Sequence, residues 1–381
     1  MKKPILIFTI ILTFTIKSSS AQNNLIDSLS FNTEKGLLIF EGYLNGVKTD
    51  FAFDTGASLG ALNSKNLDEA KIEISGSKNI RDSQKKSAKL DLAKINTLKI
   101  GPHSFSNITS VVADMPFLFC NKTYLLGGDI INKLNWKFDF KKNIVYFSKT
   151  AFTPENNMQQ MPFKIVGNRH FTNLTIANTP VDNILIDFGY AGNCTMDANI
   201  KSTKEVAKKV LPENLYKFKS SSMGINTMSS GKPTNTFFMD SVVFGGVVLN
   251  NFKINAMVNT HNKIGLYFLK NNFNQLIINS IDLKYWLLPN NIAPKRQMNF
   301  DASFHFNDKR KIEVVALNGS AEHSANLLNI GQTITELNAR NADSFTDRCD
   351  FLIWYAEQAK KEEFSVITDK GEKLTIKKSV F

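Results

Sequence analysis

Cysteine is scarce in this sequence, and its spacing excludes two classes of site. The 381 residues contain only three cysteines, Cys120, Cys194 and Cys349, which lie far apart. Such a small and odd set excludes a disulfide framework and a cysteine-ligated zinc site, and it allows one bridge at most. We expect all three to be small, buried, apolar residues.

Histidine is almost as scarce. The five histidines share no metal-ligand spacing with one another or with the cysteines, so we expect no metal site and no other cofactor. We expect these histidines on the surface or in loops: His103, His170, His261, His305 and His323.

A long hydrophobic run is also missing after the N-terminal segment. Residues 1–21 begin with two lysines, Lys2 and Lys3, followed by an apolar run at 4–16 and the small residues Ser19, Ser20 and Ala21, a pattern typical of a secretory signal peptide. A membrane anchor is the alternative, but the run is short for a membrane span and contains three threonines. We therefore expect export to the periplasm, the cell envelope or the extracellular space.

Clustered positive charge is absent too, although basic residues outnumber acidic ones. Lys and Arg total 46 against 34 Asp and Glu, a net charge of +12, and subtracting Lys2, Lys3 and Lys17 of the signal segment leaves +9. The lysines are scattered, without an arginine cluster, so nucleic acid is not an expected partner. The length and the 43% hydrophobic content allow two or three packed domains.

What the sequence does contain is a series of short β-forming runs. Runs rich in Ile, Val, Leu and Phe alternate with Gly, Asn and Lys over residues 22–147, with hairpin signals at Asn45-Gly46 and at 141–143. Short helices are expected only at 65–71 and 129–134. The fold class is therefore predicted to be mostly β.

The same order of elements recurs in the second half. Residues 171–197 repeat 37–63, with a strand, a polar turn and a second strand that ends in Asp. Two further blocks follow in the same order, and Asp54 and Asp187 lie 133 residues apart while Gly127 and Gly265 lie 138 apart. The repeat predicts two lobes related by an approximate two-fold axis.

These patterns predict the domain limits. They are a signal peptide at 1–21, a first lobe at 22–150, a second lobe at 151–290, a linker at 291–298 and a C-terminal domain at 299–381.

The run "FAFDTGAS" places a carboxylate at the end of an apolar strand. A buried carboxylate without a partner is costly, and the repeat offers Asp187 as the partner of Asp54. With "YLLGGD" at 124–129, this run resembles the retropepsin-like aspartic proteases, over about residues 30–290 in two β-barrel lobes.

The resemblance implies a role for each motif residue. Asp54 and Asp187 would form a catalytic dyad that shares one proton and activates a water against a peptide bond, at acid to neutral pH and without a metal. The other motif residues would support the site: Thr55, Gly56, Ala57, Ser58, Gly127, Gly189 and Gly265. Thr55 would bond into the partner lobe, Gly56 would let the backbone pass close to the carboxylate, and Ser58 would cap the following helix.

The second motif departs from the family pattern. Phe188 stands where Thr is expected, and Tyr190 stands where the first lobe has Ala57. Three interpretations follow. In the first, the protein is an aspartic endopeptidase that acts as a monomer on a peptide or protein substrate. In the second, the endopeptidase is a homodimer in which each chain contributes Asp54. In the third, it is a catalytically inactive peptide-binding or scaffolding protein.

Two further segments carry open interpretations. Residues 74–94 and 220–238 fall where the family has a flap over the cleft, and mobile loops without function fit their composition equally well.

The C-terminal part is similar to a small α+β PDZ domain. Ser320-Ala321 would open a helix, residues 331–334 hold a Gly-Gln-Thr-Ile run, and a final hairpin turns at 369–371. Peptide capture and a purely structural role are both open for this domain.

Overall fold

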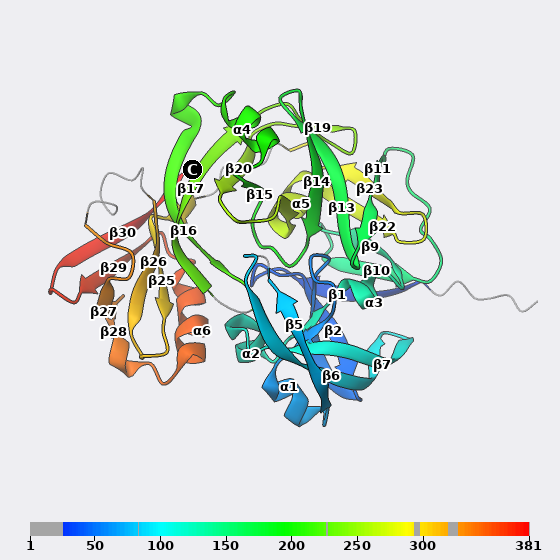
Figure 1. The fold of residues 1–381 in the computed structure, drawn as a ribbon, viewed down its shortest axis with the longest axis horizontal. Coiled ribbons are helices and arrows are strands. Elements are labelled where there is room, and N and C mark those ends of the chain that lie inside the picture. Colours follow the sequence, from blue (N-terminus) through cyan, green and yellow to red (C-terminus); the bar gives the residue numbers. More distant parts are fainter. Residues whose placement is uncertain (1–25, 83, 226–227, 293–297, 319–326, 381) are drawn as a thin grey trace, which may run out of the picture.

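The structure, a computed structural model, describes residues 26–82, 84–225, 228–292, 298–318 and 327–380. The predicted signal peptide, most of the predicted linker and the predicted helix at Ser320 lie outside the described residues. Strands dominate the described part, and Figure 1 shows them in two lobes with a third unit at one side. We refer to residues 26–150 as the first lobe, 151–292 as the second lobe and 298–380 as the C-terminal unit.

The first lobe contains β1 (Asp27–Asn32), β2 (Ile39–Leu44), β3 (Val47–Phe53), β4 (Ala61–Leu62), α1 (Ser64–Glu69), β5 (Glu73–Arg81), β6 (Ser87–Ile100), β7 (His103–Val112), α2 (Pro116–Asn121), β8 (Tyr124–Leu126), α3 (Gly128–Ile131), β9 (Asn135–Asp139) and β10 (Ile144–Ser148). Asn45 and Gly46 both have positive φ, as the tight turn between β2 and β3 requires, so this hairpin prediction is confirmed. Strand β8 crosses back and pairs parallel to β3.

The second lobe contains β11 (Gln159–Pro162), β12 (Lys164–Val166), β13 (Arg169–Ile176), β14 (Thr179–Asp187), β15 (Cys194–Asp197), α4 (Lys201–Ala207), η1 (Pro212–Asn214), β16 (Leu215–Met223), β17 (Met228–Met239), β18 (Val242–Phe244), β19 (Val247–Leu249), β20 (Phe252–Met257), β21 (Lys263–Gly265), α5 (Leu266–Asn272), β22 (Phe273–Asn279) and β23 (Lys284–Pro289). Its strand pairing follows that of the first lobe. Strand β21 pairs parallel to β14 as β8 does to β3, and β15 pairs parallel to β20 as β4 does to β7.

One antiparallel sheet joins the two lobes. Its order is β11-β23-β22-β9-β10-β1, so each lobe contributes three strands and β22 pairs with β9 at the centre. The large side chains beside it, including Trp136, Phe138 and Tyr285, are fully buried in a core cluster that extends through both lobes. The relative position of the lobes is therefore set by hydrogen-bonded strands and shared apolar packing.

The flap segments are hairpins. Strands β5 and β6 form the first, and β16 and β17 form the second. The turn of the first hairpin reaches the second lobe, where Lys85 Nζ lies 2.9 Å from Asp197 Oδ2 and Gln84 Nε2 donates to the Ser222 carbonyl. These segments are ordered β structure in the described residues.

The C-terminal unit has a core of its own, centred on Phe304, Phe351 and Phe364. It contains β24 (Met298–Phe300), β25 (Ala302–Phe306), β26 (Ile312–Asn318), β27 (Thr333–Leu337), β28 (Arg340–Asn341), η2 (Ala342–Ser344), α6 (Arg348–Gln358), β29 (Glu363–Thr368) and β30 (Lys373–Val380). Strand β26 pairs with β16 of the second flap, and Figure 1 shows this unit beside that hairpin.

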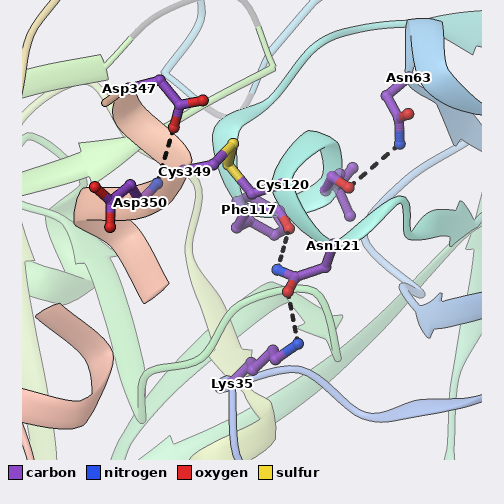
Figure 2. The surroundings of a disulfide bond; sticks show 9 residues. Lys35, Asn63, Phe117, Cys120, Asn121, Asp347, Cys349 and Asp350 are labelled. Carbon is purple, nitrogen blue, oxygen red and sulfur yellow. Dashed lines mark hydrogen bonds between the residues drawn. A yellow bond between two sulfur atoms is a disulfide. The ribbon is translucent and has the colours of Figure 1, made fainter. Parts of the chain in front are cut away.

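A disulfide joins the C-terminal unit to the first lobe, and the expectation of three unpaired cysteines was wrong. Cys120 in α2 is bonded to Cys349 in α6, with a Cα–Cα distance of 5.2 Å (Figure 2). The sequence could not show this bridge because the two residues are separated by 229 positions. Cys194 is free and buried, as expected.

The expectation for His170 was also wrong, because this side chain is fully buried between the lobes. Its Nδ1 lies 2.6 Å from the Tyr285 hydroxyl and its Nε2 lies 2.6 Å from Asn132 Oδ1. Burial lowers its pKa to about 3, so the ring is neutral and serves as a structural link.

None of the helices in the described ranges is long and apolar enough to cross a membrane. Within the same residues, no group of three or more metal-binding side chains gathers.

Candidate active site

Asp54 lies directly after β3, where the chain leaves the sheet. Its N–H donates to the Leu126 carbonyl, and its Oδ1 accepts from the N–H groups of Gly56 at 2.7 Å and Ala57 at 3.1 Å. The turn that follows Asp54 is therefore folded around its carboxyl group. These bonds orient the side chain toward the second lobe.

Asp187 occupies the corresponding position at the end of β14, opposite Gly265 of β21. Its side chain is 9% exposed, and its Oδ2 accepts from Lys263 Nζ at 2.9 Å. The apolar residues of β14 before it are buried, so this carboxylate sits at the edge of a hydrophobic strand.

The structure brings the two carboxyl groups together, and two glycines allow it. A Cβ on Gly56 would lie 2.5 Å from Asp187 Oδ1, and a Cβ on Gly189 would lie 2.3 Å from Asp54 Oδ2. Each glycine therefore makes room for the carboxyl group of the other lobe, in a reciprocal arrangement.

This environment changes the proton affinity of Asp54. Burial raises its pKa to about 8, and the neighbouring Asp187 charge acts in the same direction. Hydrogen bonding from Gly56 and the positive charge of Lys263 oppose the shift. One proton is thus retained between the carboxyl groups at neutral pH.

Thr55 joins the two turns. Its buried hydroxyl donates to the Ile186 carbonyl at 2.5 Å and accepts from the Phe188 N–H at 3.2 Å. Phe188, which replaces the expected Thr, is fully buried and packs with ring centroids 5.2 Å from Phe53 and 5.3 Å from Phe138. The hydroxyl link is therefore made from the first lobe, and apolar packing holds the second turn.

Gly127 and Gly265 lie behind the two turns. A Cβ on Gly127 would meet the backbone of Leu59, and one on Gly265 would meet the carbonyl oxygens of Tyr190 and Gly192. The residue after each glycine donates its N–H to the turn of its own lobe. Gly128 donates to the Ala57 carbonyl, and Leu266 donates to the Tyr190 carbonyl. The crossing segments thus pack directly against the active-site turns in both lobes.

The expected capping role of Ser58 was wrong. The next helix, α1, begins at Ser64, and its N-cap is Asn63, whose side chain accepts from the Asn66 N–H. Ser58 instead uses its carbonyl, which accepts from Asn168 Nδ2 of the second lobe at 3.0 Å. The residues between Ser58 and Asn63 continue through β4, so no helix starts close enough to Ser58.

Tyr190 is held at the side of the site. Its hydroxyl accepts from Thr195 Oγ1 at 2.8 Å, and its ring lies 4.2 Å from Lys263 Nζ. It lines the cleft without replacing either carboxylate.

Lys263 is the residue that sequence reasoning missed. Its side chain is 12% exposed, beside both carboxyl groups. A signal was available in the repeat, because the first lobe has Leu125 where the second has Lys263, two residues before the equivalent glycines. A charged residue in an otherwise apolar buried strand indicates a partner.

A single cavity contains these groups. Its volume is about 1010 Å³, and both carboxyl groups, both flaps and the C-terminal unit line it. The C-terminal unit contributes Phe300, Asp301 and Asn318 among others. One wall of the cavity therefore comes from outside the two lobes.

Comparison with known proteins agrees with this geometry. Residues 40–130 match the family model for aspartyl proteases. This range contains the Asp54 turn, the first flap and the crossing strand β8, and it supports an aspartic-type peptidase, a class of hydrolase. No curated protein sequence matches the chain at a significant level.

Solved structures also resemble the chain. One is a retropepsin-like aspartic protease from Rickettsia conorii, which is 21% identical with a TM-score of 0.26 and covers 32% of this chain and 89% of its own.

Proposed function

We propose that this protein is an aspartic endopeptidase in which Asp54 and Asp187 form the catalytic dyad. The observation that carries the proposal is the reciprocal fit of each carboxyl group against the glycine of the other lobe, within one cavity. Two carboxyl groups this close share a proton, which is the state required for acid and base chemistry at a single site.

The chemistry follows from that state. The ionised carboxylate takes a proton from a water, the water oxygen bonds to the peptide carbonyl carbon, and the protonated carboxyl gives its proton to the carbonyl oxygen. The carboxyl that took the water proton then gives it to the amide nitrogen, while the other carboxylate takes back a proton from a hydroxyl of the tetrahedral intermediate. The C–N bond breaks, the amine and a carboxylic acid are released, and the dyad ends with one proton, as it began.

The substrate we propose is an extended peptide that lies in the cavity beneath the two flaps. Strand β5 is at the edge of its sheet, where an extended peptide would add a further strand. The C-terminal unit would close one side of the cleft through its β24 and β25 segment.

For the C-terminal unit we favour a structural role over peptide capture. The Phe304 N–H donates to the Tyr355 hydroxyl, and Asp301 Oδ1 accepts from Asn318 and Ser379, so these groups are already bonded within the unit. Its PDZ-like character remains a resemblance of sequence pattern.

A monomer suffices for this mechanism, because one chain supplies both carboxyl groups and three strands on each side of the joining sheet. The specific activity should therefore be independent of protein concentration. A fall in specific activity on dilution would favour the homodimer. Export is supported by the predicted signal peptide and by the Cys120–Cys349 bond, since disulfides persist in oxidising compartments.

The test is cleavage of an unbiased peptide mixture between pH 3 and 10 by the native protein, Asp54→Asn and Asp187→Asn. We expect cleavage by the native protein, silence of both variants, and decline of the native rate as pH rises through about 8, where Asp54 ionises. Loss with Asp54→Asn alone would indicate a dimer built on Asp54. No cleavage by any form would indicate an inactive, peptide-binding protein.

A further inference from the structure

Lys263 is an ammonium group placed against a carboxyl dyad. Its Nζ lies 2.9 Å from Asp187 Oδ2, and the two side chains are 12% and 9% exposed. Screening by solvent is weak at such burial, so the pairing acts at close to full strength on the protonation of its partner.

Three titratable groups near Lys263 favour its charged form. Asp187, Tyr190 and Asp54 raise the pKa of Lys263 against the opposing effect of burial. The Tyr190 ring also lies 4.2 Å from the ammonium. The cation is thus retained despite its burial.

On the other side, His261 precedes Lys263 by two residues. Burial lowers the pKa of His261, and the positive charges of Arg169, Lys85, Lys263 and Arg81 act in the same direction. At neutral pH His261 therefore adds no further positive charge near the dyad.

The residue two positions before the crossing glycine is apolar in the first lobe and charged in the second. The first lobe has Leu125-Leu126-Gly127, and the second has Lys263-Ile264-Gly265. Leu125 belongs to an apolar cluster with Ala52 and Ala61, whereas Lys263 is paired to Asp187. Lys263 is therefore a charged side chain beside the dyad that has no counterpart in the first lobe.

We propose that Lys263 is a positioning residue that keeps Asp187 ionised, so that the proton shared by the dyad resides on Asp54. The inference rests on the proposed dyad and deepens it. Asp187 then takes the proton from the attacking water, which bonds to the carbonyl carbon, and Asp54 gives its proton to the carbonyl oxygen.

The hydrogen bonds agree with this assignment of roles. Asp54 Oδ1 accepts two backbone N–H groups, which leaves Oδ2, beside Gly189, as the oxygen placed to carry the proton. The Asp187 oxygen that accepts the ammonium is bound as a charged acceptor.

The sign of the pH effect follows from the charge. A cation favours the ionised form of a nearby carboxyl group, so Lys263 opposes the rise in the pKa of Asp54. Its removal should therefore move the alkaline limb of the pH–rate profile upward, by about one to three pH units.

The test uses the full chain with Lys263→Leu, which gives the second lobe the residue of the first, and Lys263→Arg, which keeps the charge. Carboxyl carbon NMR of aspartate-labelled protein follows the dyad directly, and the two signals are assigned by their loss in Asp54→Asn and Asp187→Asn. In the native protein at pH 6 we expect Asp187 to have the shift of a carboxylate and Asp54 that of a carboxylic acid.

In Lys263→Leu the titration of Asp54 should rise by about one to three pH units, and in Lys263→Arg it should remain at the native value. A protonated Asp187 in the native protein, or an unchanged titration in Lys263→Leu, would overturn the inference. If Lys263→Leu does not fold, the protonation states of Asp54 and Asp187 in the native protein and in Lys263→Arg still test the inference. Peptide cleavage is measured in parallel, so an inactive native protein would refute the proposed function while the carboxyl titration still judges Lys263.

Discussion

At the scale of single residues, Thr55 supplies the hydroxyl that joins the Asp54 turn to the Asp187 turn. Removing it leaves the buried N–H of Phe188 without its acceptor. Thr55→Ala should lower the free energy of unfolding by about 1–3 kcal/mol. Because the turns would no longer be aligned, kcat should fall by about 10- to 100-fold.

Urea unfolding and steady-state kinetics measure the two effects. Thr55→Ser is the matched control, since it keeps the hydroxyl and should retain most of both properties. Equal behaviour of the Ala and Ser variants would show that the link between the lobes does not depend on the hydroxyl.

The proton on Asp54 also affects stability. Its pKa is raised from an ordinary value of 3.8 to about 8 in the folded protein, so the native state holds a proton that the unfolded chain releases above about pH 4. The contribution of this group to the free energy of unfolding is therefore largest below about pH 4, and it is lost as pH rises toward about 8.

Asp54→Asn removes this titration. Between pH 4 and 8 the native protein should lose this contribution and the variant should not. The free energy of unfolding of the variant minus that of the native protein should therefore rise by a few kcal/mol, on the order of 1.4 kcal/mol for each pH unit of the pKa shift. Urea titrations at several pH values measure it. A constant difference between the two proteins would contradict the raised pKa.

At the scale of elements, the turn of the first flap is held against the second lobe by two side-chain contacts. Lys85 pairs with Asp197, and Gln84 donates to the second flap at Ser222. The Asp197 side chain is 6% exposed, while Lys85 is about one third exposed, so the pair is partly screened.

Lys85→Ala should loosen the turn of the hairpin. We expect faster amide hydrogen exchange in β5 and β6 and a KM that changes by a few-fold, on the order of the 0.5–1 kcal/mol that such a pair contributes. Lys89→Ala, an exposed lysine on the same hairpin, is the matched control. Identical exchange in both variants would show that the Lys85 contact does not hold the flap.

At the scale of the whole molecule, the C-terminal unit is tied to both lobes. Strand β26 pairs with the second flap, and the Cys120–Cys349 bond reaches α2 of the first lobe. Beside the bond, Asn121 donates to the Phe117 carbonyl and accepts from Lys35 Nζ, so α2 is also fixed within its own lobe (Figure 2).

Cys349→Ser should therefore release one of the two attachments. We expect a loss of about 2–5 kcal/mol in the free energy of unfolding and faster proteolytic release of a C-terminal fragment. Cys194→Ala is the control, because it leaves the bridge intact. Adding a reductant to Cys194→Ala should produce the same changes as Cys349→Ser. Unchanged proteolysis of Cys349→Ser would show that the β16–β26 pairing alone holds the unit.

The sequence by itself determined the local parts of this molecule. Apolar alternation and the Asn45-Gly46 turn predicted the hairpins, and the Asp54 motif with its crossing segment predicted the first active-site turn. These features depend on neighbours within a few residues, so a sequence pattern can carry them. The two flap segments were ambiguous in composition, and only their cross-strand pairing decided that they are hairpins.

Only the tertiary structure decided how distant parts meet. Three features depend on contacts between segments far apart in the chain: the Cys120–Cys349 bond, the burial of His170 between the lobes, and the pairing of β16 with β26. The start of α1 at Ser64 depends on the path of the backbone. Lys263 is the sharpest case. The repeat marks it as a charge in a buried strand, but the partner that keeps it charged, Asp187, is identified only when the fold places them 2.9 Å apart.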